Sequence, residues 1–276
     1  MKIALVLHPS RSVAADLAGA VAAAAASLDI EVSVDAADAD RVPGAIPRDG
    51  DELTADVVVA VGGDGTVLEA ARRAVAPGLP VVGVHAGNVG FLAEIQPEEI
   101  ATALASLQSG KYTVTERMTL QAETSNGERL SALNDVVVEK DVSQHIIRVG
   151  VFADSEQLVE YRADGVIVAT PTGSTAYTFS AGGPLIDPDL EALTVTAVAP
   201  HTLFGRPIVF APTTVLRLQL AGERPARLNA DGRDHGLLQP GESVSVTVGP
   251  EVIRLIRLQP QHFAAAVKRK FHLHDA

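Results

Sequence analysis

The sequence element that most constrains the fold is the stretch 56–66, which reads Asp-Val-Val-Val-Ala-Val-Gly-Gly-Asp-Gly-Thr. Residues 57–61 form a continuous apolar run, which is typical of a strand buried on both faces of a parallel sheet. This run leads into a glycine-rich turn and then a helix-like stretch, 67–75. A glycine-rich turn between strand and helix presents backbone N–H groups that suit a phosphate. Asp64 would then stand at the carboxyl end of the strand, where open α/β sheets bind their ligands.

The same turn also has a purely structural interpretation. Asp is a favoured N-cap residue, so Asp64 could serve only to cap the following helix. The three glycines could serve only to form a tight turn. Gly-Gly-Asp-Gly alone does not separate these interpretations, because short motifs occur by chance.

Residues 1–110 alternate strand-length and helix-length segments, which predicts an α/β domain with a parallel sheet. Strands are expected at 2–8, 30–34, 57–61 and 79–84. Helices are expected from Ser10 or Ser12 to Leu28, at 67–75 and at 97–109, the last ended by Gly110. Residues 35–40 carry three aspartates and are interpreted as a solvated loop, with a metal cluster as the alternative. Residues 44–54 form a long connection of the kind that is often functional or mobile.

The pattern changes after Lys111 to short runs rich in Val, Leu, Ile and Thr. Asn126-Gly127 separates the runs 112–124 and 129–139, and this dipeptide is a strong hairpin signal. Further strands are expected at 146–153, 157–161, 165–169, 193–198, 208–210, 215–220, 226–230, 243–248 and 252–258. Residues 111–258 are therefore predicted to form an all-β domain with two packed sheets. Residues 259–276 are expected to contain a C-terminal helix, at 261–270, that packs back on the first domain.

Composition excludes several classes of function. The net charge of −12 argues against nucleic acid or anionic membranes as partners, since binding them needs clustered cations. The chain has no cysteine, which excludes disulfides, thiolate catalysis and Cys-ligated zinc. Residues 1–9 do not form a signal peptide, and the weakly polar stretch 17–28 is too short to span a bilayer. We therefore expect a cytoplasmic protein.

Polar clusters in the second half mark a candidate binding region. Asn134-Asp135 precedes an apolar run, and residues 162–165 read Arg-Ala-Asp-Gly before another. The run 170–184 is rich in hydroxyl groups and ends in Gly-Gly-Pro, which suits a polar ligand such as a ribose or phosphate. The structural alternative is a Ser/Thr-capped helix over 174–180.

Together these motifs resemble the NAD kinase family over most of the chain. Gly-Gly-Asp-Gly alone is not specific, because diacylglycerol kinases, sphingosine kinases and phosphofructokinases share it. The long run 164–184, in the right order after the glycine-rich turn, is highly specific. The matching segments are 62–66, 90–94, 133–137, 164–177, 180–184 and 199–207.

The resemblance implies transfer of a phosphoryl group to the 2′-hydroxyl of the adenosine ribose of NAD, which gives NADP. Asp64 matches the catalytic proton acceptor, and the donor would be ATP or polyphosphate. Mg²⁺ would be held mainly through the phosphates, with no protein ligand assigned. The phosphate-binding residues would be Gly62, Gly63, Gly65 and Thr66.

The resemblance also implies that the second domain binds NAD. Arg162 and Asp164 would act across an interface between subunits, because the family forms homodimers and homotetramers. His145 and Arg233 match more variable positions, with a surface-loop histidine and a solvated turn residue as the alternatives. We interpret His201 as a structural, hydrogen-bonded core residue. The substrate-binding residues that the resemblance implies are Gly65, Asn134, Asp135, His145, Arg162, Asp164, Thr175, Ala176, Tyr177, Ser180, Ala199 and Arg233.

Two positions depart from the family pattern. The family usually has Asn at the position of His85, and often a basic residue at the position of Glu69. These departures bear on NAD affinity and donor choice but leave Asp64 in place. These departures keep open a catalytically silent nucleotide sensor as an alternative function. A second alternative is a related Gly-Gly-Asp-Gly kinase for another hydroxyl acceptor.

Overall fold

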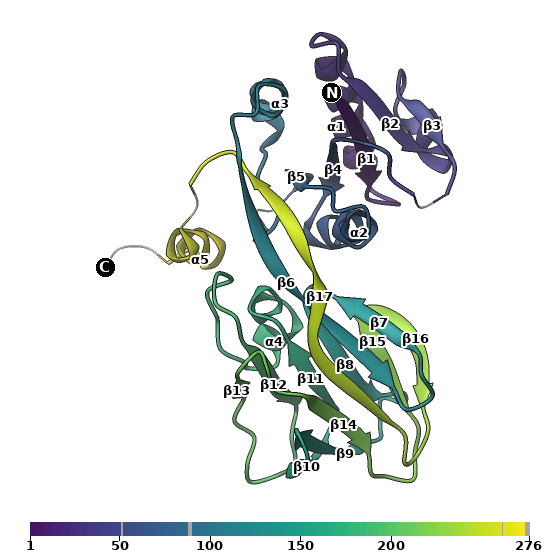
Figure 1. The fold of residues 1–276 in the computed structure, drawn as a ribbon, viewed down its shortest axis with the longest axis vertical. Helices are drawn as coiled ribbons and strands as arrows, with labels where there is room; N and C mark the ends of the chain where they lie inside the picture. The colour runs from purple at the N-terminus through teal and green to yellow at the C-terminus, as the bar shows by residue number, and fades with distance from the viewer. Residues whose placement is uncertain (51, 88–89, 261, 274–276) are drawn as a thin grey trace. The chain divides into compact units, whose positions relative to one another are not determined.

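The computed structural model describes residues 1–50, 52–87, 90–260 and 262–273 (Figure 1). The chain divides into two compact units. Unit 1 comprises Met1–Glu116 and Val252–Ala276, and unit 2 comprises Arg117–Glu251. The divisions fall within two long strands, β6 (Thr113–Thr124) and β17 (Ser243–Arg257), so each of these strands contributes residues to both units.

Unit 1 is built on a parallel sheet with the order β3-β2-β1-β4-β5. Every residue of β4 and β5 is buried, as the continuous apolar run at 57–61 predicts. The outer edge of β5 pairs with β17 through Leu255 and Val81. The strands are β1 (Lys2–Leu7), β2 (Glu31–Asp35), β3 (Ile46–Arg48), β4 (Val57–Gly62) and β5 (Val81–His85).

Helices cover both faces of this sheet. The alanine-rich α1 and α3 share one apolar core with alternate residues of the strands, among them Ile3, Val59 and Val82. On the opposite face, α2 places Val67 directly against Gly83 of β5. The helices of unit 1 are α1 (Ser12–Ala26), α2 (Asp64–Val75), α3 (Ile100–Gln108) and α5 (Phe263–Phe271), with 3-10 helices η1 (Ala36–Arg41) and η2 (Pro97–Glu99).

Unit 2 consists of two antiparallel sheets packed face to face. The first contains parts of β6 and β17 with β7 (Arg129–Ala132), β9 (Ile147–Ala153), β10 (Glu156–Ala163) and β14 (Leu216–Leu220). The second has the order β13 (Ile208–Phe210), β12 (Leu193–Val198), β11 (Gly165–Ala169), β8 (Asp135–Lys140), β15 (Ala226–Ala230) and β16 (Arg233–Leu238). One apolar core joins them, with Val149 and Leu218 from the first sheet and Val136 and Val168 from the second. The predicted fold class, an α/β domain and an all-β domain of two sheets, is confirmed.

Several local predictions need correction in unit 2. The run 129–139 is not one strand, because it breaks at Leu133 and Asn134 into β7 and β8, which belong to different sheets. The runs 243–248 and 252–258 form one strand, β17, through Gly249 and Pro250. The strand β16 was not predicted, because its sequence, Arg-Asp-His-Gly-Leu-Leu, has few strand-forming residues.

Unit 1 also differs locally from the sequence-based expectation. Residues 36–41 form η1 rather than a loop, and Asp35 pairs with both Arg48 and Arg73. Across the described ranges no group of three or more His, Cys, Asp or Glu side chains could hold a metal ion. The connection 44–54 contains the short strand β3, and its residue 51 lies outside the described residues.

The C-terminal helix begins at Phe263, and Gln261, the predicted start, lies outside the described residues. Residues 88 and 89, which come after β5 in the sequence, also lie outside them. No helix in the described part of the chain is long and apolar enough to cross a membrane.

Candidate active site

Asp64 is the first residue of α2 and directly follows the glycine-rich turn at the carboxyl end of β4. Gly63, in an extended conformation, occupies the N-cap position, and no side chain caps the helix. The Asp64 carboxylate instead accepts hydrogen bonds from backbone N–H groups of a second loop. Oδ2 accepts from Phe91 at 2.9 Å, and Oδ1 accepts from Leu92 at 3.0 Å and Ala93 at 3.4 Å. Asp64 is therefore not the N-cap that the structural interpretation assumed.

The glycines of the two loops divide into two kinds. A Cβ atom at Gly90 would lie 2.0 Å from Asp64 Oδ1, and one at Gly62 would lie 2.1 Å from Thr66 Oγ1. These two positions need glycine because the neighbouring groups pack directly against the backbone. Gly63 and Gly65 have no heavy atom within 4 Å of a Cβ placed there. Their backbone is therefore open to the close approach of a ligand.

The loop that holds Asp64 is itself fixed to β5. Gly83 O accepts hydrogen bonds from Glu94 N at 3.0 Å and Ile95 N at 2.9 Å, and His85 N donates to Ile95 O at 2.9 Å. A Cβ at Gly83 would lie 2.8 Å from Ala93 Cα, so the loop packs tightly on the strand. The orientation of the Asp64 carboxylate is thus set by two adjacent strands of one sheet.

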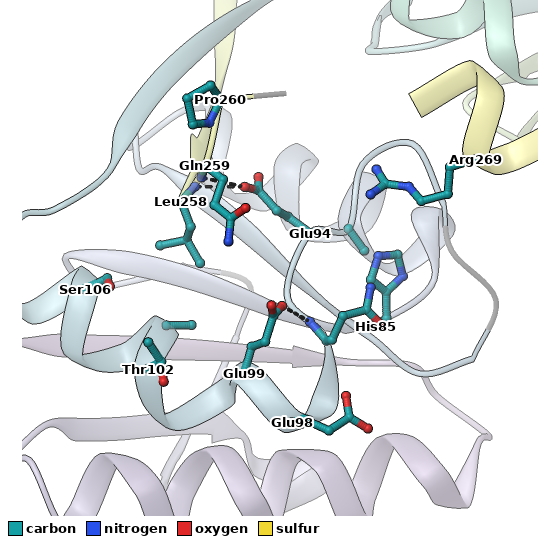
Figure 2. Close-up of a pocket in the computed structure, with 13 residues that line it drawn as sticks. His85, Glu94, Glu98, Glu99, Thr102, Ser106, Leu258, Gln259, Pro260 and Arg269 are labelled. Atoms are coloured by element: carbon teal, nitrogen blue, oxygen red, sulfur yellow. Dashed lines mark hydrogen bonds between the residues drawn. The ribbon is translucent and has the colours of Figure 1, made fainter. Parts of the chain in front are cut away.

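His85 ends β5 and is only 2% exposed. Burial lowers its pKa, and the charges of Arg269 and Lys270 act in the same direction, while Asp64 opposes them. The imidazole is therefore neutral at neutral pH. Its Nδ1 has no hydrogen-bond partner among the described residues. His85 also lines a cavity of about 450 Å³, together with Glu94, Gln259 and Arg269 (Figure 2).

Glu69, the other departure from the family pattern, lies in α2 beyond Asp64. Its carboxylate forms an ion pair with Arg72 at 2.6 Å, and both side chains are about two-fifths exposed. The negative charge of Glu69 is thus balanced within the helix.

In unit 2, three loop segments meet at one end of the second sheet. Ala169 of β11 pairs with Asp135 of β8, and Ala230 of β15 pairs with Val136. The segments that adjoin these strand ends carry Asn134, Thr170 and Asp231. The register therefore brings Asn134-Asp135 beside the hydroxyl-rich run, as the candidate site requires.

Asp231 organises this end of the sheet. Its carboxylate accepts hydrogen bonds from the backbone N–H groups of Leu133 at 2.7 Å, Asn134 at 2.7 Å and Asp135 at 3.2 Å. These contacts take up amide groups that a continuous strand would use, which explains the break between β7 and β8. Thr170 fixes the same turn, because its N–H donates to Asn134 O at 2.9 Å and its hydroxyl to Leu133 O at 2.6 Å.

The hydroxyl-rich run forms two short helices, η3 (Thr172–Thr175) and α4 (Tyr177–Ser180). Gly173 packs on the turn so closely that a Cβ would lie 2.1 Å from Asn134 O. Thr175 and Ala176 are half-buried, and Tyr177 and Ser180 are exposed.

Burial and neighbouring carboxylates shift the pKa values of several groups around Tyr177. Burial, with the nearby charges of Asp231 and Glu139, raises the pKa of Asp135 to about 7. Burial raises the pKa of Asp231, against the effect of its three N–H donors. Burial also raises the pKa of Tyr177, and the charges of Glu139, Asp164 and Asp135 add to this shift. Tyr177 thus lies within the field of three carboxylates, two of which were predicted substrate-binding residues.

The remaining predicted residues lie elsewhere in unit 2. Asp164 pairs with Lys140 at 2.7 Å and donates its N–H to Val198 O, next to Ala199. Arg162 has an exposed side chain, and His145 is exposed in the loop after β8. Arg233 begins β16, after the turn at Asp231.

The prediction that His201 is a hydrogen-bonded core residue is wrong, because its side chain is exposed. Its backbone N–H donates a hydrogen bond to Arg162 O at 2.7 Å.

Comparison with known proteins decides the family. Residues 4–112 match the ATP-NAD kinase N-terminal domain, and residues 133–258 match the ATP-NAD kinase C-terminal domain. The chain belongs to the NAD kinase family. It is 40% identical over 222 residues to the NAD kinase of Moorella thermoacetica, covering 79% of this chain and 71% of that protein. It is 40% identical over 207 residues to an NAD kinase of Pseudomonas putida (strain W619), covering 73% and 70%.

Solved structures share the fold of this NAD kinase family member. Yeast NADH kinase complexed with NADH has a TM-score of 0.88 and 23% identity, over 100% of this chain and 89% of that one. An NAD kinase from Archaeoglobus fulgidus in complex with ATP has a TM-score of 0.74 and 25% identity, over 99% and 97%.

Sequence reasoning missed four residues that shape the site: Glu94, Glu139, Lys140 and Asp231. The turn sequence Asp231-Gly232 was visible, but its contact with residue 134 joins positions 97 apart in the chain. Lys140 and Asp164 likewise become partners only through the pairing of β8 with β11. No local pattern marks such contacts, so only the strand register could have revealed them.

Proposed function

We infer that the protein is an NAD kinase that phosphorylates NAD to NADP. The observation that carries this inference is the match of both parts of the chain to the two NAD kinase domains, with Asp64 held at the open glycine-rich turn. The ATP complex of the Archaeoglobus fulgidus NAD kinase supports ATP as the donor. Polyphosphate as a donor stays a prediction.

We propose that Asp64 orients the 2′-hydroxyl of the adenosine ribose and accepts its proton. The hydroxyl oxygen attacks the γ-phosphorus, the bond to the β–γ bridging oxygen breaks, and ADP leaves. Because phosphoryl transfer has a loose transition state, positioning contributes more than basicity. The three N–H donors on Asp64 support this assignment, because they fix the direction in which the carboxylate points.

We propose that Gly62, Gly63, Gly65 and Thr66 form the phosphate-binding turn. The open space at Gly63 and Gly65 supports this, because backbone N–H groups at a helix N-terminus suit phosphate oxygens. Mg²⁺ bound with the nucleotide would neutralise phosphate charge. We propose that phosphate oxygens supply most of its ligands.

We propose that the residues of unit 2 bind NAD. Asn134 and Asp135 would hold the adenosine, and the cluster around Tyr177 supports a ligand rich in hydroxyl and amino groups there. Arg162 would meet the pyrophosphate, which suits a guanidinium, and Asp164 would meet the nicotinamide amide. Gly65 in unit 1 is proposed as a further substrate contact. The remaining proposed contacts in unit 2 are His145, Thr175, Ala176, Ser180, Ala199 and Arg233.

Homodimer or homotetramer formation and a cytoplasmic location are also proposed, from the resemblance alone. The exposed Arg162 side chain is consistent with a contact from a neighbouring subunit. The two alternative functions, a kinase for another hydroxyl acceptor and a silent sensor, have no specific observation in their favour.

The direct test is an assay of the purified protein with NAD, ATP and Mg²⁺, in which an NADP-specific dehydrogenase measures the product. NADP formation that needs both ATP and Mg²⁺ is the expected result. Parallel reactions with polyphosphate and with NADH determine the donor and acceptor range. NAD binding by calorimetry without turnover would contradict the proposal and support the silent sensor.

A further inference from the structure

The C-terminal part of unit 1 is attached to the loop that holds Asp64. This loop, 91–94, donates three backbone N–H groups to the Asp64 carboxylate. Two of its side chains, Phe91 and Glu94, contact the chain between residues 257 and 271. We call these two attachments, Glu94 with Arg257 and Phe91 with Phe271, the C-terminal clasp.

Both oxygens of the Glu94 carboxylate have partners, and the side chain is almost buried. Glu94 Oε1 accepts hydrogen bonds from Leu258 N at 2.9 Å and Gln259 N at 3.2 Å (Figure 2). Its Oε2 pairs with Arg257 Nη1 at 3.2 Å. The side chains of Glu94 and Arg257 are 12% and 9% exposed. Removing one partner of such a pair leaves a buried charge without compensation, so the contact resists displacement.

The Phe91 attachment is an aromatic contact with the last residue of α5. The ring centroids of Phe91 and Phe271 lie 6.2 Å apart, and the rings are tilted by 52°, an arrangement that aromatic pairs favour. Phe91 is also the residue whose N–H donates to Asp64 Oδ2 at 2.9 Å. One residue thus joins the C-terminal helix to the catalytic carboxylate.

We propose that Phe271 and Glu94 are positioning residues for the kinase reaction. They hold the loop 91–94 at the distance from which its N–H groups orient Asp64. Loss of the clasp would let the loop, and with it the carboxylate, move from the reacting geometry. A displacement of about 1 Å at a catalytic group can lower the rate about 100-fold. This inference rests on the proposed role of Asp64.

The test compares four variants: Phe271→Ala, Phe271→Tyr, Glu94→Gln and Phe263→Ala. Phe263 is the first residue of α5, so Phe263→Ala removes a ring of the same size from the other end of the same helix. We expect Phe271→Ala and Glu94→Gln to lower kcat about ten-fold or more, with KM for NAD and ATP changed less than two-fold. Phe271→Tyr should keep most of the wild-type kcat, and Phe263→Ala should keep all of it.

A second readout does not depend on activity. Hydrogen exchange of the backbone amides of Phe91, Leu92 and Ala93 should accelerate in Phe271→Ala and in Glu94→Gln but not in Phe263→Ala. Thermal unfolding shows whether each variant is folded, and Phe271→Leu replaces Phe271→Ala if the latter does not fold. Unchanged exchange and unchanged kcat in a folded clasp variant would overturn the proposal. An inactive wild type with the expected exchange pattern would instead contradict the proposed function alone.

Discussion

Asp64 and Gly90 approach so closely that a methyl group on Gly90 would lie 2.0 Å from Asp64 Oδ1. Gly90 therefore permits the hydrogen bonds from Phe91, Leu92 and Ala93 that orient the carboxylate. The glycine lies in the loop after β5, and the aspartate begins α2 after β4, so this contact joins the ends of two neighbouring strands.

Gly90→Ala should consequently displace the Asp64 carboxylate. We expect kcat to fall about 100-fold, because small misplacements of catalytic groups are costly. Steady-state kinetics with NAD and ATP measures this. Gly19→Ala is the matched control, since Gly19 lies within α1 with no heavy atom within 4 Å of its Cβ position. That variant should keep its activity and gain roughly 0.5–1 kcal/mol in stability, because Ala favours helices over Gly.

Substitution of Asp231 tests whether its carboxylate stabilises the turn that carries Asn134. Asp231→Ala removes the acceptor for three backbone N–H groups and places Ala at a φ of 49°. We expect a loss of about 2 kcal/mol or more in the free energy of unfolding, and a rise in KM for NAD as the turn at Asn134 relaxes. Denaturant unfolding measures the first effect. Asp231→Asn, which keeps one acceptor oxygen and tolerates positive φ, should lose less on both measures, and equal losses would contradict this account.

The pKa of Asp135, raised to about 7, predicts a pH-dependent stability. Between pH 4 and 7 the folded protein keeps a proton on Asp135 that the unfolded chain loses, so folding weakens as the pH rises through this range. Asp135→Asn removes the effect, and above pH 7 it should be more stable than the wild type by roughly 4 kcal/mol at most. The difference should vanish near pH 4. Thermal unfolding of both proteins from pH 4 to 8 tests this, and a difference that grows toward acid pH would contradict it.

His85 should have the opposite pH dependence. Burial lowers its pKa, so below pH 6.5 the unfolded chain binds a proton that the folded protein does not, and stability falls as the pH falls. His85→Asn, the residue usual in the family, should flatten this part of the stability curve. Urea unfolding at pH 5, 6 and 7 measures the slope. A slope that is the same in both proteins would show that His85 is not held neutral by burial.

Much of this fold could be predicted from local patterns, and the exceptions share a cause. The apolar run 57–61 identified the buried strand β4. The helix expected at 97–109 corresponds to η2 and α3, and Gly110, at a φ of 69°, follows the C-cap of α3. The break between β7 and β8 could not be predicted, because it depends on the carboxylate of Asp231, far along the chain. The three partners of Asp64 are backbone N–H groups. The segment 90–94 was matched to the family, but no side chain in it identifies the N–H groups as donors to Asp64.

The most direct measurement of the central claim is the turnover of Asp64→Asn beside the wild type. NADP formation from NAD, ATP and Mg²⁺ is followed at saturating substrate, with calorimetry of NAD binding to show that the variant remains competent to bind. The account predicts a fall in kcat of about 10²- to 10⁴-fold, the range for loss of a general base, with NAD binding retained. Undiminished turnover in a folded Asp64→Asn would contradict the assignment of Asp64 as the proton acceptor.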